Sequence, residues 1–132
     1  MRKVNILTKG FISANSISFL LPLLKNKNKL RDNGIEVNFF RQFHDSILNC
    51  DNLIFDSKFF KFSWGRKDLK KTRNFFEFCK KKTNQLVFAD LSDSASFIIS
   101  DALEISDKYF KNQVLKKKKK LFKKFLWKKN FF

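Results

Sequence analysis

Residues 3–10 read KVNILTKG, and this stretch sets the expectation for the fold. Its first part, residues 3–7, is a short apolar run that predicts a buried β-strand close to the start of the chain. Thr8-Lys9-Gly10 is predicted to form a turn, because glycine adopts backbone angles that other residues avoid. The same sequence of a short apolar run and then turn residues recurs further along the chain.

A helix is predicted directly after this turn. Four apolar residues with the spacing i, i+3, i+4, i+7 define one helical face: Ile17, Leu20, Leu21 and Leu24. The candidate N-caps are Asn15, Ser16 and Ser18. Pro22 is expected to kink the helix unless it lies in the first turn. Asn33-Gly34 is predicted to end it.

Further strands are predicted at 35–40, 52–55 and 85–89, with a short fifth strand at 102–106. A basic helix is predicted at about 66–82, and a last helix from about Asp107. Short apolar strands separated by helical stretches are typical of a parallel sheet that helices cover. The predicted fold class is therefore α/β: a Rossmann-like, mostly parallel sheet of four to five strands flanked by helices, with a basic C-terminal helix.

The chain has 132 residues, which fits one domain, predicted here as residues 1–115 followed by a lysine-rich helical tail at 116–132. Apolar residues make up 43% of it, which is enough for a core. Cys50 and Cys79 lie far apart and form no CxxC motif, so neither a metal site nor a disulfide framework is expected. No apolar run approaches the length of a membrane span, and a cytoplasmic location is expected.

The net charge of +17 is unevenly distributed. The tail at 116–132 holds nine lysines and no acid, so residues 1–115 carry 29 − 9 = 20 basic and 12 acidic residues, or +8. Phe, Lys, Asn and Ile are abundant, as A/T-rich codons would make them, and such a bias raises the lysine content without any binding partner. Charge alone therefore does not predict nucleic-acid binding.

The tail is open to three interpretations. Phe110, Val114, Leu121 and Phe125 are predicted to lie roughly along one helical face among lysines, which is typical of a helix that lies on an anionic membrane surface. Basic and aromatic residues together would also suit single-stranded nucleic acid. Finally, the run at 116–120 is a place where a reading frame can slip, so the tail can equally be an out-of-frame end.

Polar residues follow three of the predicted strands. In open parallel α/β sheets, ligands bind beyond the carboxyl ends of the strands. This principle selects as candidate binding residues Lys9, Gly10, Asp56, Asp90, Ser92 and Asp93. The competing interpretation is structural, because Asp and Ser at strand ends also form turns and helix caps. Neither GxGxxG nor a P-loop motif is present, so no cofactor is expected.

His44 is the only histidine in the chain. With Asp45 beside it, His44 could serve as a general base tuned by a carboxylate. Adjacent side chains usually point apart, however, so an ordinary surface or loop histidine is the simpler interpretation. No catalytic residue is assigned from the sequence.

The order of these features resembles the N-terminal domain of glycosyltransferase-like proteins from bacterial surface-polysaccharide clusters. The matching stretches, which span residues 1 to about 115, are KVNILTKGF, NGIEVNFF, CDNLIFDSKFF with Trp64 after it, LVFADLSDSAS and SDKYFKNQVLK. The resemblance implies a GT-B architecture, in which two Rossmann-like halves enclose the active site between them. In such enzymes the N-terminal half commonly faces the acceptor, and the C-terminal half binds the nucleotide-sugar donor.

On this resemblance, Gly10, Asn15, Asp90 and Asp93 would face the cleft. The chain would be the acceptor-side half of a truncated glycosyltransferase, inactive without its C-terminal donor-binding domain. The implied partners are that domain, a nucleotide-sugar and a glycan acceptor, and the tail would add a peripheral contact with an anionic membrane. The alternative function is a small basic module that binds an anionic membrane surface or nucleic acid.

Overall fold

The computed structural model describes residues 1–60, 69–92, 98–112 and 130–131. Six strands are described: β1 (Arg2–Leu7), β2 (Ile35–Phe40), β3 (Asn52–Asp56), β4 (Gln85–Asp90), β5 (Lys108–Lys111) and β6 (Asn130–Phe131). The helices are α1 (Ala14–Lys25), α2 (Lys27–Asp32), α3 (Leu69–Lys82) and α4 (Ser100–Ile105), with the 3₁₀ turns η1 (Asp45–Leu48) and η2 (Ser57–Phe60).

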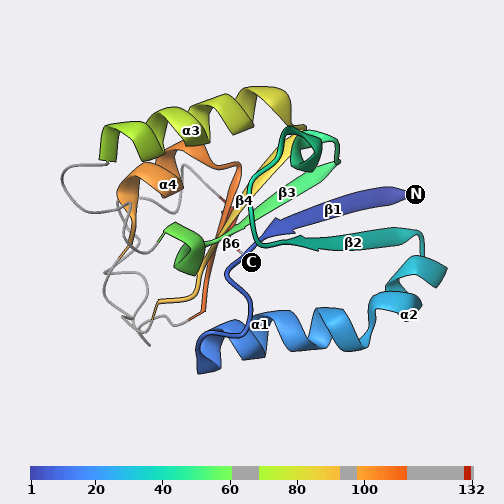
Figure 1. Cartoon of the computed structure of the whole chain (residues 1–132). Coiled ribbons are helices and arrows are strands. Elements are labelled where there is room, and N and C mark those ends of the chain that lie inside the picture. The colour runs from blue at the N-terminus through green and yellow to red at the C-terminus, as the bar shows by residue number, and fades with distance from the viewer. Residues whose placement is uncertain (61–68, 93–97, 113–129, 132) are drawn as a thin grey trace.

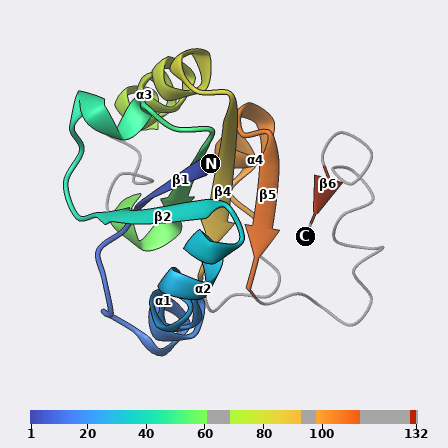
Figure 2. The same cartoon turned by 90° about the vertical axis from the view of Figure 1, so that its right-hand side faces the viewer.

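The strands form one sheet in the order β2-β1-β3-β4-β5-β6, and every neighbouring pair is parallel (Figures 1 and 2). The predicted Rossmann-like α/β class is thereby confirmed. The order 2-1-3-4-5 is the flavodoxin-like variant of the doubly wound fold. Its topological switch point lies between β1 and β3, because the chain leaves β1 toward one edge and continues from β3 toward the other.

Helices cover the two faces of the sheet unequally. Figure 1 shows α3 and α4 above the sheet and α1 with α2 below it. The larger core lies under α3 and α4, where the rings of Phe55, Phe76 and Phe88 pack at centroid distances of 5.0 and 5.6 Å. Under α1, the buried cluster among the described residues is smaller and consists of Ile6, Leu20 and Val37. Most of the burial is therefore on the α3 side.

The α1 region differs from the sequence expectation at its start. Ser13, rather than Asn15, Ser16 or Ser18, is the N-cap, and its side chain accepts the Ser16 N–H at 3.1 Å. Pro22 lies well beyond the first turn, and α1 ends three residues later at Lys25, before α2 begins at Lys27. The predicted stop at Gly34 is confirmed by its φ of 82°.

The predicted apolar face of α1 is only partly directed at the sheet. Leu20 is buried, with Phe19 and Leu23 beside it, whereas Ile17 and Leu24 are 41% and 40% exposed. The helix is thus apolar on two sides. The spacing rule identified the helix but could not say which of its apolar rows faces inward.

The prediction for residues 102–111 is wrong. The predicted fifth strand at 102–106 is helix α4, and the predicted helix from Asp107 is strand β5. Ala102, Leu103 and Ile105 are buried against the sheet as one helical face, so a buried helix of six residues gives an apolar run as short as that of a strand.

Two other predicted segments are only partly described. The basic helix predicted at 66–82 is α3 over its described part. The predicted C-terminal helix lies mainly at 113–129, outside the described residues, but Phe110, which was predicted on its apolar face, lies on strand β5. Asn130 and Phe131, the described residues of the tail, pair with β5 as a strand.

Candidate functional site

The carboxyl edge of the sheet brings together most of the predicted site residues. Lys9 and Gly10 follow β1, Asp56 ends β3, and Asp90 ends β4 with Ser92 just beyond it. Asn15, in the first turn of α1, reaches the same edge, where its side-chain amide donates to the Leu91 carbonyl at 2.9 Å. Asp93 belongs to residues 93–97, outside the described residues.

Asp56 joins the two strands of the switch point. Its Oδ2 accepts the Thr8 hydroxyl at 2.6 Å, and its Oδ1 accepts the Lys58 backbone N–H at 2.8 Å. Burial raises the pKa of the Asp56 carboxyl above its ordinary value, while these two hydrogen bonds oppose the rise. Both carboxylate oxygens are thus engaged in holding β1 and the start of η2 in place.

The loop after β1 depends on the same pair. The Thr8 hydroxyl also accepts the Gly10 N–H at 3.0 Å, and Gly10 has a φ of 85° that a residue with a Cβ rarely adopts. Arg41 donates to the Lys9 carbonyl at 3.2 Å. The Lys9 ammonium lies 5.1 Å from the centroid of the Phe59 ring. Two cationic side chains from different strand ends therefore flank Gly10.

Asp90 is the centre of a second buried network. Its Oδ2 accepts both the Tyr109 hydroxyl and the Lys111 ammonium, the latter at 3.1 Å, and its Oδ1 accepts the Ser92 N–H at 3.0 Å. The side chains of Asp90 and Lys111 are both 0% exposed. Burial raises the pKa of the Tyr109 hydroxyl, and the neighbouring Asp90 charge raises it further. The network ties the ends of β4 and β5 together.

The sequence pattern does not identify Tyr109 and Lys111 as site residues. The cause is the misassignment of 102–111, because a residue placed on a helix is not considered as a strand end. The run Lys108-Tyr109-Phe110-Lys111 shows no alternation of apolar and polar residues, because one of its two inward-facing residues is a lysine, so this run carries no strand signal.

His44 precedes η1 as an exposed residue and makes no side-chain cap hydrogen bond there. Cys50 and Cys79 are free thiols, Cys79 buried and Cys50 half-buried. Over the described ranges, no three His, Cys, Asp or Glu residues are grouped so that they could hold a metal ion. The same ranges contain no helix long and apolar enough to cross a bilayer.

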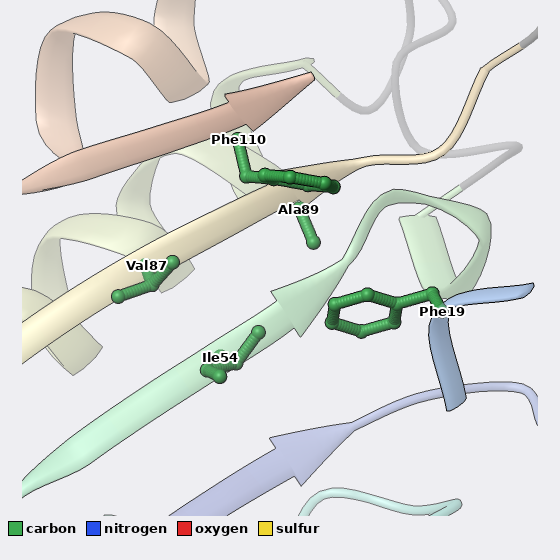
Figure 3. A pocket seen from close by; sticks show the side chains of 5 residues that line it. All are labelled: Phe19, Ile54, Val87, Ala89 and Phe110. Carbon is green, nitrogen blue, oxygen red and sulfur yellow. The ribbon is translucent and has the colours of Figure 1, made fainter. Parts of the chain in front are cut away.

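A separate hollow lies on the α1 side of the sheet, away from these polar groups. Its volume is about 260 Å³, and it is lined by apolar side chains only: Phe19, Ile54, Val87, Ala89 and Phe110 (Figure 3). The lining side chains of β3, β4 and β5 all point to the same face of the sheet. With no polar group among them, they offer no orienting contact for a sugar or a phosphate.

No protein-family model matches this chain, and neither a curated protein nor a solved structure is significantly similar to it. The site must therefore be interpreted from its own geometry. That geometry separates two groups of residues. Asp90, Tyr109 and Lys111 are buried and bonded to one another, and Asp56 is buried and bonded to Thr8 and the Lys58 backbone, so these groups shape the edge. Lys9, Gly10 and Ser92 lie at or near its surface, where a ligand can reach them.

Proposed function

We propose that this chain is the acceptor-side, N-terminal half of a GT-B type glycosyltransferase that uses a nucleotide-sugar donor. The observation that carries the proposal is the convergence of Lys9, Gly10, Asn15 and Ser92 on the carboxyl edge, beside the switch point where doubly wound sheets bind ligands. The resemblance of residues 1 to about 115 to such domains agrees with this placement.

The hydrogen bonds at this edge favour binding over catalysis. Asp56 and Asp90, the two carboxylates that the structure describes at this edge, are fully buried and engaged with neighbouring groups. A general base must reach the acceptor hydroxyl directly or through one water. Neither carboxylate is free to do this as long as its oxygens accept the hydrogen bonds described above. We therefore expect this chain to bind an acceptor but not to turn it over without a second domain.

The proposal is tested by amide chemical shifts in the full chain. We would titrate maltotriose as a glycan probe and UDP-glucose as a donor probe, and record two-dimensional nitrogen–proton spectra. The expected result is perturbation by the glycan of the amides of Gly10, Lys58 and Ser92, with little effect of UDP-glucose. The matched control residues are Asn33 and Gly34, which lie at the amino edge in an equally exposed turn.

Perturbation by UDP-glucose alone would assign the edge to the donor and overturn the acceptor-side assignment. If neither probe perturbs these amides, or if Gly34 responds as strongly as Gly10, the edge is not a sugar site. A second line of support is activity in trans. Glycosyl transfer that needs both this chain and a separately supplied donor-binding domain is the result we expect, and transfer by this chain alone would contradict the proposal.

A further inference from the structure

The first 31 residues contain seven basic residues and no acidic one. They form β1, α1 and all of α2 except its last residue, Asp32, which is the single acidic side chain on these three elements. Five ion pairs link described residues, and none of them involves this segment; four lie on α3, α4 and the turn after α4, and the fifth is Lys111 with Asp90. Two of the six cations of α3, Arg73 and Lys80, are thus paired with acids, whereas none of the seven cations of residues 1–31 is in an ion pair with a described residue.

The same layer exposes an unusual amount of apolar surface. Phe11 and Ile12 are 51% and 53% exposed, because a tight turn, closed by the Ile12 N–H on the Gly10 carbonyl at 2.9 Å, directs the chain outward. Ile17, Leu21 and Leu24 continue from them at i, i+4 and i+7 along the outside of α1. We call these five residues the α1 stripe. Figure 1 shows α1 as the outermost layer on its side of the sheet.

Basic residues stand at both ends of the α1 stripe. Lys9 and Arg41 lie at its start, beside Gly10. Lys25, Lys27 and Lys29 lie at its end, where α1 passes into α2. An apolar helical face bordered by cations and free of acids is the chemistry of a helix that lies in the plane of a lipid interface. Lysines there place their ammonium groups at the level of the headgroups.

We propose that the α1 stripe is a membrane-contact surface that binds bilayers containing anionic phospholipid. The occupant is the lipid surface because the stripe needs an apolar partner and its borders need negative charge, and an anionic bilayer interface supplies both over one plane. A second copy of this chain would instead oppose positive borders to positive borders. The proposal concerns the outside of α1 and does not depend on the glycosyltransferase assignment.

The test is sedimentation of the full chain with vesicles of phosphatidylcholine, with and without phosphatidylglycerol. Each basic residue near an anionic surface contributes about five-fold to the partition coefficient, which corresponds to about 1 kcal/mol. The double variant Lys25→Gln/Lys29→Gln should therefore bind anionic vesicles about 25-fold more weakly than the wild type. The matched control, Lys71→Gln/Lys81→Gln, has the same net charge and removes exposed lysines of α3 on the opposite layer.

That control should change binding by less than about three-fold, because charges further than a Debye length from the lipid are screened. Both variants keep residues 116–132, so binding through the tail would affect them equally. Equal weakening of the two pairs would show that net charge or the tail drives association, and would overturn the proposal. Absence of binding to anionic vesicles would overturn it as well.

The apolar part is tested separately with Ile17→Ser/Leu24→Ser. Transfer of these half-exposed side chains into lipid contributes about five-fold each, so a loss of about 25-fold is expected. Phe78→Ser is the control, since Phe78 is 44% exposed on α3 and has the Lys82 ammonium 6.0 Å from its ring centroid. Circular dichroism verifies that each variant is folded. One outcome would assign the stripe to a second copy of the chain instead. In it, the wild type does not bind vesicles, gel filtration shows a dimer, and Ile17→Ser/Leu24→Ser makes that dimer dissociate.

Discussion

The buried pair of Lys111 and Asp90 allows a sharp test of how the edge of the sheet is held. Lys111→Met removes the ammonium and leaves a carboxylate that is 0% exposed. Breaking a buried ion pair from one side costs about 3–5 kcal/mol. Because the Tyr109 hydroxyl and the Ser92 N–H still donate to Asp90, we expect the lower end of this range, about 3 kcal/mol.

Urea unfolding followed by circular dichroism measures this difference. In thermal unfolding, a domain of this size should lose about 4 °C for each kcal/mol, or about 12 °C in all. The double variant Asp90→Asn/Lys111→Met keeps an acceptor for Tyr109 and Ser92 but has no buried charge. It should therefore be more stable than Lys111→Met alone, and the resulting coupling energy should reach about 2 kcal/mol.

Lys80→Met is the matched control for burial. The Lys80 ammonium lies 2.6 Å from Asp107, but the two side chains are 36% and 28% exposed. Water screens such a pair, so its loss should cost no more than about 1 kcal/mol. If Lys111→Met lowered the free energy of unfolding by no more than Lys80→Met, the pair of Lys111 and Asp90 would not be desolvated. It would then not fix the ends of β4 and β5.

Three further predictions concern single positions. Burial raises the folded-state pKa of Asp56 above its unfolded value, so the stability that this group contributes is greatest at low pH and is lost as the pH rises through the folded pKa. The free energy of unfolding of the wild type, relative to that of Asp56→Asn, should therefore increase as the pH falls from neutral toward about 4. Urea unfolding measures this difference, and a difference that is independent of pH would contradict the prediction. Gly34→Ala should cost about 1 kcal/mol, because φ is 82° although nothing lies within 4 Å of the added methyl group, and a neutral effect in thermal unfolding would show that the turn can rearrange. Burial raises the pKa of both thiols, that of Cys79 to about 12, but Cys50 is only half-buried, so Cys50 should react first with iodoacetamide in the native chain. Peptide mass spectrometry can show the order, and earlier labelling of Cys79 would mean that the core opens locally.

Much of the fold could be predicted from the sequence where one physical signal dominates. Strand β2 was predicted with its observed limits, because Gly34 ends the preceding helix and a β-rich apolar run follows at once. The prediction for residues 100–111 is wrong because α4 has only six residues. So short a buried helix shows too little of its 3.6-residue period for its sequence to differ from that of a strand.

The candidate site was predictable to the extent that it depends on strand ends. Lys9, Gly10, Asp56, Asp90 and Ser92 could be selected because each follows an apolar run, and the parallel sheet places all such positions at one edge. What could not be selected is the partner of each carboxylate. Thr8 is 48 residues from Asp56, and Lys111 is 21 residues from Asp90, and only strand pairing sets these distances.

The hydrogen-bond partners also change the role that can be assigned to the two carboxylates. In the sequence, Asp56 and Asp90 are candidates for binding a ligand; in the fold, their oxygens hold the loops that follow β1, β3 and β4. A buried carboxylate engaged in this way is desolvated, and a ligand would have to break its hydrogen bonds in order to use it. Under the proposed function, the ligand would therefore contact the groups that these carboxylates position, which are the backbone around Gly10 and the side chains of Lys9 and Ser92. It follows that substitution of Asp56 or Asp90 would disturb ligand binding through the loops, and only a variant such as Lys9→Gln can report on contact itself.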